Sequence, residues 1–289
     1  MLDDLTTGSM ENLRHVRRDR MRVVNIDVRK TGAILEYFQD VDVVFHLAAL
    51  AGVKLATRSP LRTLDNNIQT TRSVLEACSS AGVERLVFAS SSEVYGETST
   101  CPMNENVPLS PISSYGVSKI TGEFYCMAFQ KKYGIRVSIV RYFNVYGPRQ
   151  SAKMKSWVVP AFISNVIEKR PLIVHGQGDQ TRDFTYIDDA VKGTYLVGTR
   201  SYGHGEIFNI GTGIETSVLD LARLILSVTR SSNPIIHTRP RRFHISRRCA
   251  DISKARSELG YSPSISLRNG VKRTYEFFRK SYHGKMSRQ

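Results

Sequence analysis

The sequence predicts an α/β protein built on a doubly wound, mostly parallel sheet. Residues 41–49 are an apolar run of the length expected for a strand buried on both faces of such a sheet, residues 83–90 are the next buried strand, and residues 135–141 are another strand. Segments with the three-and-four apolar spacing of helices separate these runs, so strands and helices alternate as in right-handed βαβ units. At 289 residues the chain is long enough to bury a sizeable core.

The remaining elements follow from the same patterns, taken in chain order. Strands are expected at 23–27, 172–174 and 207–210; helices at 34–38, 61–81, 157–169, 188–199, 216–229 and 266–279; and a polar turn at 176–183. Residues 14–20 form an arginine-rich helix or loop. Gly82 ends the second of these helices, because glycine readily takes the left-handed conformation of a helix C-terminus.

Composition narrows the class of protein. Lys and Arg total 41 against 26 Asp and Glu, a net charge of +15 that we interpret as a solvated surface rather than a nucleic-acid site. The four cysteines include no Cys-x-x-Cys pair, which predicts reduced thiols, a cytoplasmic protein and no metal site. No apolar run reaches the ~18 residues of a membrane span, so no membrane partner is expected.

Tyr115 and Lys119 form the central chemical motif. They are four residues apart, so they share one face of a helix that Ser113 and Ser114 can cap. An ammonium near a phenol favours the phenolate, and a tyrosine so placed can transfer protons. Upstream, Ser90 and Ser91 leave the carboxyl end of the strand at 83–90, the end of a parallel sheet where ligands gather.

With these residues in view, the chain resembles the extended short-chain dehydrogenase/reductases of the NAD-dependent epimerase/dehydratase family, above all the UDP-glucose 4-epimerase branch. The resemblance runs over nearly the whole length. It rests on six segments in order: 46–49 (His-Leu-Ala-Ala), 91–96, Tyr115-x-x-x-Lys119, 141–149, 182–189 and 208–213.

The resemblance implies a Rossmann-type fold and a set of catalytic roles. Tyr115 would be the acid/base at the sugar 4-hydroxyl, Lys119 would lower the pKa of Tyr115 and hold the nicotinamide ribose, and Ser91 would bind the same hydroxyl. A tightly held NAD would oxidise C4 transiently and reduce it again. His46 is expected to pack near the cofactor without a catalytic role.

The resemblance also implies binding residues and partners. The cofactor residues would be Asp3, Asp27, Val28, Leu47, Ala48, Ala49, Asn67, Ser90, Tyr115, Lys119 and Tyr142. The substrate residues would be Ser91, Asn144, Arg182 and Arg241, with arginine forks gripping the diphosphate of a UDP-sugar. Residues 1–150 would be a truncated NAD-binding domain, and 151–289 mainly a nucleotide-sugar-binding region interleaved with it. The resemblance also implies a homodimer that forms through the Tyr115 helix and the helix before it.

Glu93 leaves a second reaction open. Related dehydratases carry Thr-Asp-Glu where this chain has Ser91-Ser92-Glu93, so loss of the aspartate disfavours dehydration. The retained glutamate also resembles that of UDP-glucuronate decarboxylases. Decarboxylation is therefore the alternative within the family, and sugar-nucleotide dehydration, though disfavoured, stays open beside it. The alternative of another class is an inactive, non-catalytic protein that binds anions or nucleic acid on the same scaffold.

The N-terminus departs from the family pattern. The family begins with a strand and a Gly-x-x-Gly-x-x-Gly turn at the pyrophosphate, and this sequence contains no such turn. The resemblance therefore implies a sheet that lacks its first strand and a doubtful activity for the chain alone. Two explanations stay open: a start site upstream of Met1, which we favour, and a truncated gene. A second departure is 241–244, where Arg-Arg-Phe-His replaces Arg-Pro-Gly-Asp.

Overall fold

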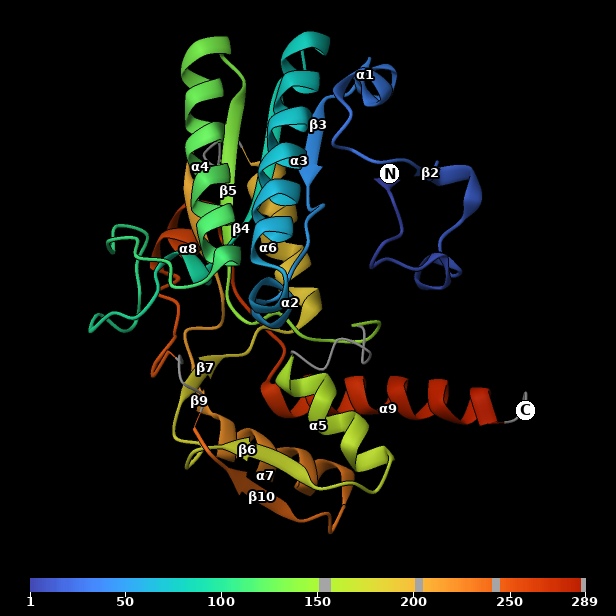
Figure 1. Ribbon diagram of the computed structural model, residues 1–289, viewed down its shortest axis with the longest axis vertical. Helices are drawn as coiled ribbons and strands as arrows, with labels where there is room; N and C mark the ends of the chain where they lie inside the picture. Colours follow the sequence, from blue (N-terminus) through green and yellow to red (C-terminus); the bar gives the residue numbers. More distant parts are fainter. Residues whose placement is uncertain (151–156, 201–204, 241–244, 287–289) are drawn as a thin grey trace. The chain divides into compact units, whose positions relative to one another are not determined.

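The computed structural model describes residues 1–150, 157–200, 205–240 and 245–286 (Figure 1). It divides into two compact units, each made of several stretches of chain. The first unit contains Met1–Val94, Leu109–Arg141 and Leu196–Phe208, and the second contains Tyr95–Pro108, Tyr142–Tyr195 and Asn209–Gln289. These units are defined by packing, so the division of functions between residues 1–150 and 151–289 stays a prediction.

A four-stranded sheet forms the centre of the first unit. Its strands stand in the order β3 (Val43–His46), β4 (Arg85–Ser91), β5 (Arg136–Tyr142) and β8 (Ile207–Ile210), and β8 runs across the boundary of the two units. β3 and β4 are parallel, with Val43 opposite Arg85. Five consecutive residues of β4 are buried, which confirms the predicted strand covered on both faces.

The helices of the first unit are α1 (Thr31–Ile34), the short α2 (Val53–Arg58), α3 (Pro60–Ala81) and α4 (Ser114–Tyr133). Two of them, α3 and α4, contact this sheet, and the two short ones pack against other helices. α3 and α4 run side by side (Figure 1). α3 ends as predicted at Gly82, whose φ is 70° and whose N–H donates to the carbonyl of Cys78. The helix α6 (Ile187–Thr199) begins in the second unit and ends in the first.

The N-terminal strands form a separate pair. β1 (Leu2–Asp3) and β2 (Val24–Asn25) are parallel, and three-residue and four-residue 3₁₀ turns at Arg18–Arg20 and Met10–Leu13 connect them. In the part of the chain that the structure describes, β3 pairs with β4 alone and no strand joins β3 to β1. This is the arrangement expected for the sheet without its first strand.

The second unit departs in part from the expected elements. Its elements are α5 (Val158–Ile167), β6 (Leu172–His175), β7 (Thr181–Asp183), β9 (Glu215–Ser217), α7 (Val218–Thr229), β10 (Ile235–Thr238), α8 (Ser253–Leu259) and α9 (Leu267–Met286). The polar turn expected to reach 183 ends earlier, because β7 pairs antiparallel with β9. β10, which is parallel to β6, and α8 were not expected.

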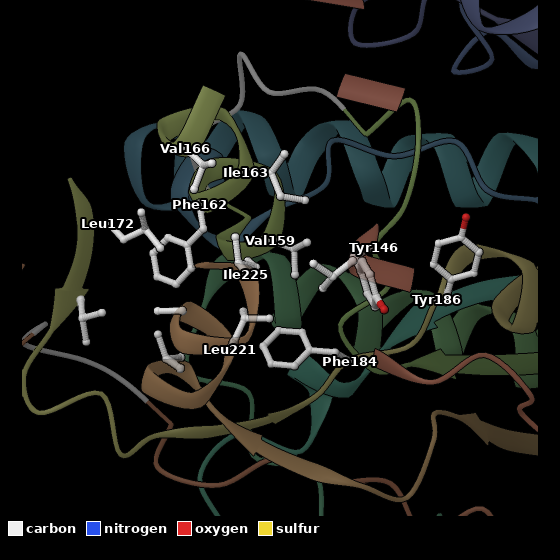
Figure 2. Close-up of a cluster of buried hydrophobic side chains, with 14 residues drawn as sticks. Tyr146, Val159, Phe162, Ile163, Val166, Leu172, Phe184, Tyr186, Leu221 and Ile225 are labelled. Carbon is white, nitrogen blue, oxygen red and sulfur yellow. The ribbon is translucent and has the colours of Figure 1, made fainter. Parts of the chain in front are cut away.

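Apolar side chains from α5, α7, β6 and the segments around Tyr146 and Phe184 form the core of the second unit (Figure 2). Tyr146 packs edge-on against Phe184 and Tyr186, with ring centroids 6.5 and 5.7 Å apart. α9 packs against Tyr146 and Tyr186 at Gly270, where a Cβ would collide with both tyrosines. No helix in the described residues has both the length and the apolar character to cross a membrane.

His46 is a core residue of the first unit, as predicted. Its ring is buried, shares a hydrogen bond of 3.2 Å with Thr71 Oγ1 and lies 5.7 Å from the ring of Phe88. Burial, and then the charge of Lys119, lowers the pKa of His46 from 6.5 to about 3. The imidazole is therefore neutral in the folded chain across the physiological range.

This burial predicts a specific acid sensitivity. Between pH 6.5 and about 3 the unfolded chain binds a proton at His46 that the folded chain does not, so stability falls as the pH falls through this window. We expect wild type to lose about 2 kcal/mol more than His46→Gln between pH 7 and pH 5, measured by urea unfolding. The exposed His237→Gln is the control and should follow wild type. Equal losses for wild type and His46→Gln would contradict the prediction.

Candidate active site

The start of α4 places the predicted tyrosine and lysine. Ser113 caps the helix, because its Oγ accepts the N–H of Gly116 at 3.1 Å. Ser114, the other predicted cap, instead donates its hydroxyl to the carbonyl of Ala56 at 3.1 Å and ties α4 to α2. Tyr115 is half-buried in the first turn, and Lys119 follows one turn later.

Lys119 points into the first unit beneath Tyr115. Its Nζ lies 5.7 Å from the centroid of the Tyr115 ring and 5.0 Å from that of Phe88, and it donates to the carbonyl oxygen of Ala89 at 2.7 Å. Burial lowers the pKa of Lys119 from 10.5 to about 8, against an opposing effect of Cys126 and Glu123. The positive charge that favours a phenolate is therefore present below about pH 8 and is lost above it.

Ser91 and Glu93 reach the same helix through a tight contact. β4 ends at Ser91, and a 3₁₀ turn follows at Ser92–Val94, in which the N–H of Glu93 donates to Ser91 Oγ at 3.2 Å. A Cβ on Gly116 would lie 2.7 Å from the Glu93 carbonyl oxygen, so only glycine allows this approach. The structure thus brings Ser91 and Glu93, both half-buried, beside the turn of α4 that carries Tyr115.

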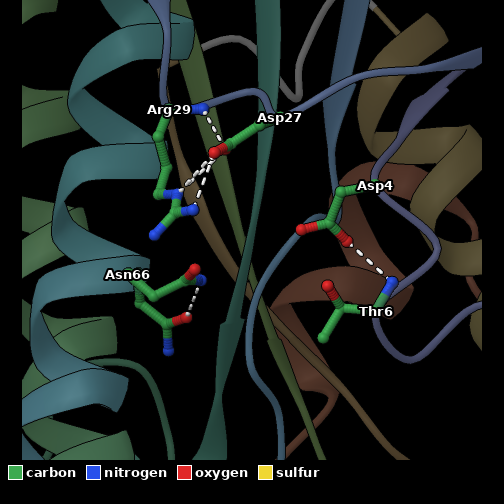
Figure 3. A network of polar contacts seen from close by, with 6 residues as sticks. Asp4, Thr6, Asp27, Arg29 and Asn66 are labelled. Atoms are coloured by element: carbon green, nitrogen blue, oxygen red, sulfur yellow. Dashed lines mark hydrogen bonds and ion pairs between the residues drawn. The ribbon is translucent and has the colours of Figure 1, made fainter.

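Three predicted cofactor residues lie near the chain start. Asp3, at the end of β1, accepts the N–H of Leu5 at 2.7 Å, and a Cβ on Gly8 would lie 3.1 Å from its carboxylate oxygens. Asp27 accepts the guanidinium of Arg29 at 2.7 Å, which holds the pKa of Asp27 at about 2 (Figure 3). Val28 packs against the core of the first unit.

Asn67 holds the loop after β3. Its Nδ2 donates to the Leu50 carbonyl at 3.1 Å and to Ser118 Oγ at 2.9 Å, and its Oδ1 accepts the Leu50 N–H at 2.8 Å. The buried amide is thus committed to the protein, so it supports a cofactor through the loop at residues 47–50. In that loop, Leu47 is 58% exposed while Ala48 and Ala49 are half-buried.

These residues fit the two ends of a dinucleotide. The backbone of Gly8 lies close to the Asp3 carboxylate. The carboxylate oxygens of Asp3 are acceptors suited to the hydroxyls of one ribose. The ammonium of Lys119 and the phenol of Tyr115 are the donors suited to the other ribose. For the diphosphate between them, the sequence provides no Gly-x-x-Gly-x-x-Gly turn.

The second unit holds the other predicted residues, each described by itself. The phenol of Tyr142 shares a 2.6 Å hydrogen bond with Thr194 Oγ1. Arg182 donates from one terminal nitrogen to the carbonyls of Thr181 and Ile245, at 2.6 and 2.9 Å. Asn144 has a φ of 25°, a left-handed conformation that few non-glycine residues adopt. Its buried Oδ1 has no hydrogen-bond partner among the described residues. Arg241 lies outside those residues.

Two buried residues beside the site were missed from the sequence. Glu123 lies one turn beyond Lys119 on α4 and pairs with Arg141 at the end of β5. The spacing of four from Lys119 was a readable signal for the glutamate. Ser90, predicted to contact the cofactor, donates its hydroxyl to Glu123 at 2.5 Å. Its cofactor contact stays a prediction.

The comparisons with known proteins agree with this geometry. The model of the NAD dependent epimerase/dehydratase family matches residues 1–211. The chain belongs to this family. A putative UDP-glucose 4-epimerase of Methanocaldococcus jannaschii is 37% identical over 283 residues, which are 97% of this chain and 90% of that protein. A UDP-N-acetyl-alpha-D-glucosaminuronate decarboxylase of Bacillus cytotoxicus is 35% identical over 270 residues, 89% of this chain and 83% of that protein.

Solved structures of the family share the fold. The UDP-glucose 4-epimerase of Thermotoga maritima, crystallised with UDP-glucose, has a TM-score of 0.92 at 32% identity, covering 97% of this chain and 90% of its own. The UDP-glucuronic acid 4-epimerase of Bacillus cereus, in complex with UDP-glucuronic acid and NAD, has a TM-score of 0.89 at 33% identity, with the same coverage. The predicted family, Rossmann-type fold and NAD cofactor are therefore confirmed.

Proposed function

We propose that the chain is an NAD-dependent nucleotide-sugar 4-epimerase that acts on a UDP-hexose by transient oxidation at C4. The observation that carries the proposal is the juxtaposition of Tyr115, Lys119 and Ser91 at the contact between α4 and the end of β4. The relatives named UDP-glucose 4-epimerase support the choice of reaction.

Ser91, Tyr115 and Lys119 have different roles in the proposed proton transfer. In this proposal Ser91 Oγ, which accepts the Glu93 N–H, binds the sugar 4-hydroxyl, and the Tyr115 phenolate takes the proton of that hydroxyl as general base. Buried Lys119 stabilises the phenolate by its charge. A bound NAD, held by Lys119 and Tyr115 at its nicotinamide end, would supply the two-electron oxidation and reduction at C4. Tyr115 then gives the proton back.

The substrate diphosphate is assigned to the second unit. Arg182 keeps its guanidinium anchored on two backbone carbonyls, which fixes the direction of a fork suited to phosphate oxygens. A ligand would account for the strained conformation of Asn144, whose buried Oδ1 finds no hydrogen-bond partner in the described part of the chain. Arg241 completes the proposed set.

The direct test is turnover. Purified chain is incubated with NAD and UDP-glucose, and UDP-galactose is measured; NAD binding is measured in parallel by fluorescence titration. A version extended by the upstream in-frame codons is the comparison, because the diphosphate turn is absent from the present sequence. Conversion by either version supports the proposal. NAD binding without conversion of any UDP-hexose would refute it, and salt-sensitive nucleic-acid binding without turnover would favour the non-catalytic alternative.

The presence of Glu93 supports a second candidate function, the decarboxylation of a UDP-uronate. The residue is half-buried beside Ser91, and one of the relatives above is a UDP-sugar-acid decarboxylase. The same assay run with UDP-glucuronate separates the two reactions. Release of CO₂ that Glu93→Gln abolishes would favour decarboxylation, while conversion of the neutral sugar alone would favour epimerisation.

We also propose a homodimer through α3 and α4. The outer face of α4 exposes Val117, Phe124 and Met127 at 38, 60 and 44%, and Leu61 at the start of α3 is 73% exposed. Such a cluster of apolar side chains on paired helices is typical of a protein interface.

The dimer proposal predicts the effect of a charge at its centre. Phe124→Glu is expected to weaken dimerisation by roughly 30-fold or more, because aromatic residues at the centre of an interface dominate its affinity. Sedimentation equilibrium measures the effect. Tyr195→Glu, at an exposed aromatic on α6, is the matched control and should leave the mass unchanged. A wild-type chain that is monomeric at micromolar concentration would refute the proposal.

A further inference from the structure

Three buried side chains beside Lys119 form a polar network that the steps above do not use. Ser90 Oγ donates to Glu123 Oε1 at 2.5 Å, and Arg141 donates from Nε to Oε1 at 3.0 Å and from a terminal nitrogen to Oε2 at 2.7 Å. The Arg141 and Glu123 side chains are 3% and 1% exposed. The network thus joins β4, α4 and β5 inside the first unit, sealed from solvent.

Stability alone does not account for such a network. The cost of removing two charges from water offsets most of their attraction, so a buried ion pair contributes little net free energy compared with apolar residues of similar volume. What the network does provide is a fixed geometry. Its position relative to the catalytic residues is therefore the informative feature.

The network sets the register between α4 and β4. On successive turns of α4, Lys119 contacts the Ala89 carbonyl at 2.7 Å and Glu123 contacts the Ser90 hydroxyl at 2.5 Å. Gly122 makes this close approach possible, since a Cβ there would lie 2.4 Å from the Phe88 ring. The strand residue that follows Ser90 is Ser91, so the contact fixes the strand end against the helix that carries Tyr115.

The network also places a carboxylate near a buried ammonium. The groups around Lys119 are His46 on β3, Tyr115, Glu123 and Cys126 on α4, and the ring of Phe88 on β4. Burial lowers the pKa of His46 to about 3 and raises the pKa of the Cys126 thiol well above its usual range, so both are neutral. Glu123 is the carboxylate of this group.

We propose that Ser90, Glu123 and Arg141 are positioning residues for the proposed reaction, and that the Glu123 carboxylate is the countercharge that keeps buried Lys119 protonated. Arg141 holds the Glu123 carboxylate in place by two hydrogen bonds. Ser90 is bonded to the same carboxylate, so the position of Glu123 fixes the strand residue next to Ser91. The inference rests on the proposed function only for the role of Lys119, which is to stabilise the Tyr115 phenolate. The contacts themselves do not depend on it.

Titration of Lys119 tests the proposal. The chain is labelled with [ε-¹³C]lysine, the Lys119 signal is assigned with Lys119→Arg, and its midpoint is followed by NMR. In Glu123→Gln the carboxylate is lost while the positive charge of Arg141 stays, so the Lys119 midpoint is expected to fall by about one pH unit. Glu76→Gln, which removes a half-buried carboxylate on α3 that pairs with Arg72, is the matched control and should not move it.

A second variant covers the case in which Glu123→Gln does not fold. Glu123→Gln/Arg141→Gln removes both charges of the ion pair together, and its Lys119 midpoint is expected below wild type and above the single variant. A wild-type midpoint in whichever of these variants folds would overturn the proposal. The titration requires neither NAD nor a sugar nucleotide, so its outcome is independent of whether the chain epimerises UDP-glucose.

Discussion

Replacing Tyr115 with phenylalanine is expected to lower the kcat of epimerisation about 10³-fold, because the proposed general base is lost while the ring that packs above Lys119 remains. The measurement is the initial rate of UDP-galactose formation by a version of the chain that turns over. Binding of NAD and of UDP, measured by calorimetry, is expected to stay within a few-fold of wild type.

The matched control for this variant is Tyr125→Phe, ten residues further along the same helix and partly buried in the core of the first unit. It removes the same hydroxyl without touching the proposed site, so its rate is expected to be that of wild type. A Tyr115→Phe rate within tenfold of wild type would remove Tyr115 from the proton transfer.

Replacing Asp183 with alanine is expected to lower the apparent melting temperature by roughly 10 °C. The fully buried Asp183 carboxylate accepts the N–H groups of Thr212, Gly213 and Ala250 and the hydroxyl of Thr212, at 2.6 to 3.2 Å. Without it, three backbone N–H groups lose their acceptor, and the buried N–H of Ala250 alone would cost about 1–3 kcal/mol. Calorimetry or circular dichroism measures the shift.

Asp188→Ala is the comparison for Asp183. The Asp188 side chain is 63% exposed, and its contact with Arg273 is 3.4 Å long. Exposed pairs of this kind contribute at most about 1 kcal/mol, so the melting temperature is expected to change by no more than a few degrees. Similar shifts for the two aspartates would show that the carboxylate of Asp183 is not what holds this turn.

The elements that could be predicted are those that bury apolar surface along their own length. The strand expected at 83–90 is β4, and the apolar spacing after residue 60 belongs to α3. Both were predictable because the apolar residues that each element buries follow a regular pattern along its own sequence. β10 could not be predicted in this way. It has four residues, most of them exposed, and its partner β6 lies some sixty residues earlier in the chain.

The site divides along the same line. The spacing of Tyr115 and Lys119 on one helix was predictable because a helix fixes it. The role of Asn67 was not, because the fold alone brings the Leu50 backbone to its amide. The pairing of Glu123 with Ser90 likewise depends on the distance between a helix and a strand. Sequence spacing gives the members of one element, while partners across elements require the structure.

Gly116 and Gly122 have a consequence for mutational maps of this protein. Gly116 meets the turn after β4 and Gly122 meets the middle of β4, and a single added methyl would collide with the Glu93 backbone or the Phe88 ring. In a saturation library selected for growth on the product, both positions would tolerate only glycine, as strictly as Tyr115 and Lys119 tolerate only themselves. Intolerance in such a map would thus mark four positions on one helix, and at the two glycines its cause would be close packing rather than the proposed chemistry.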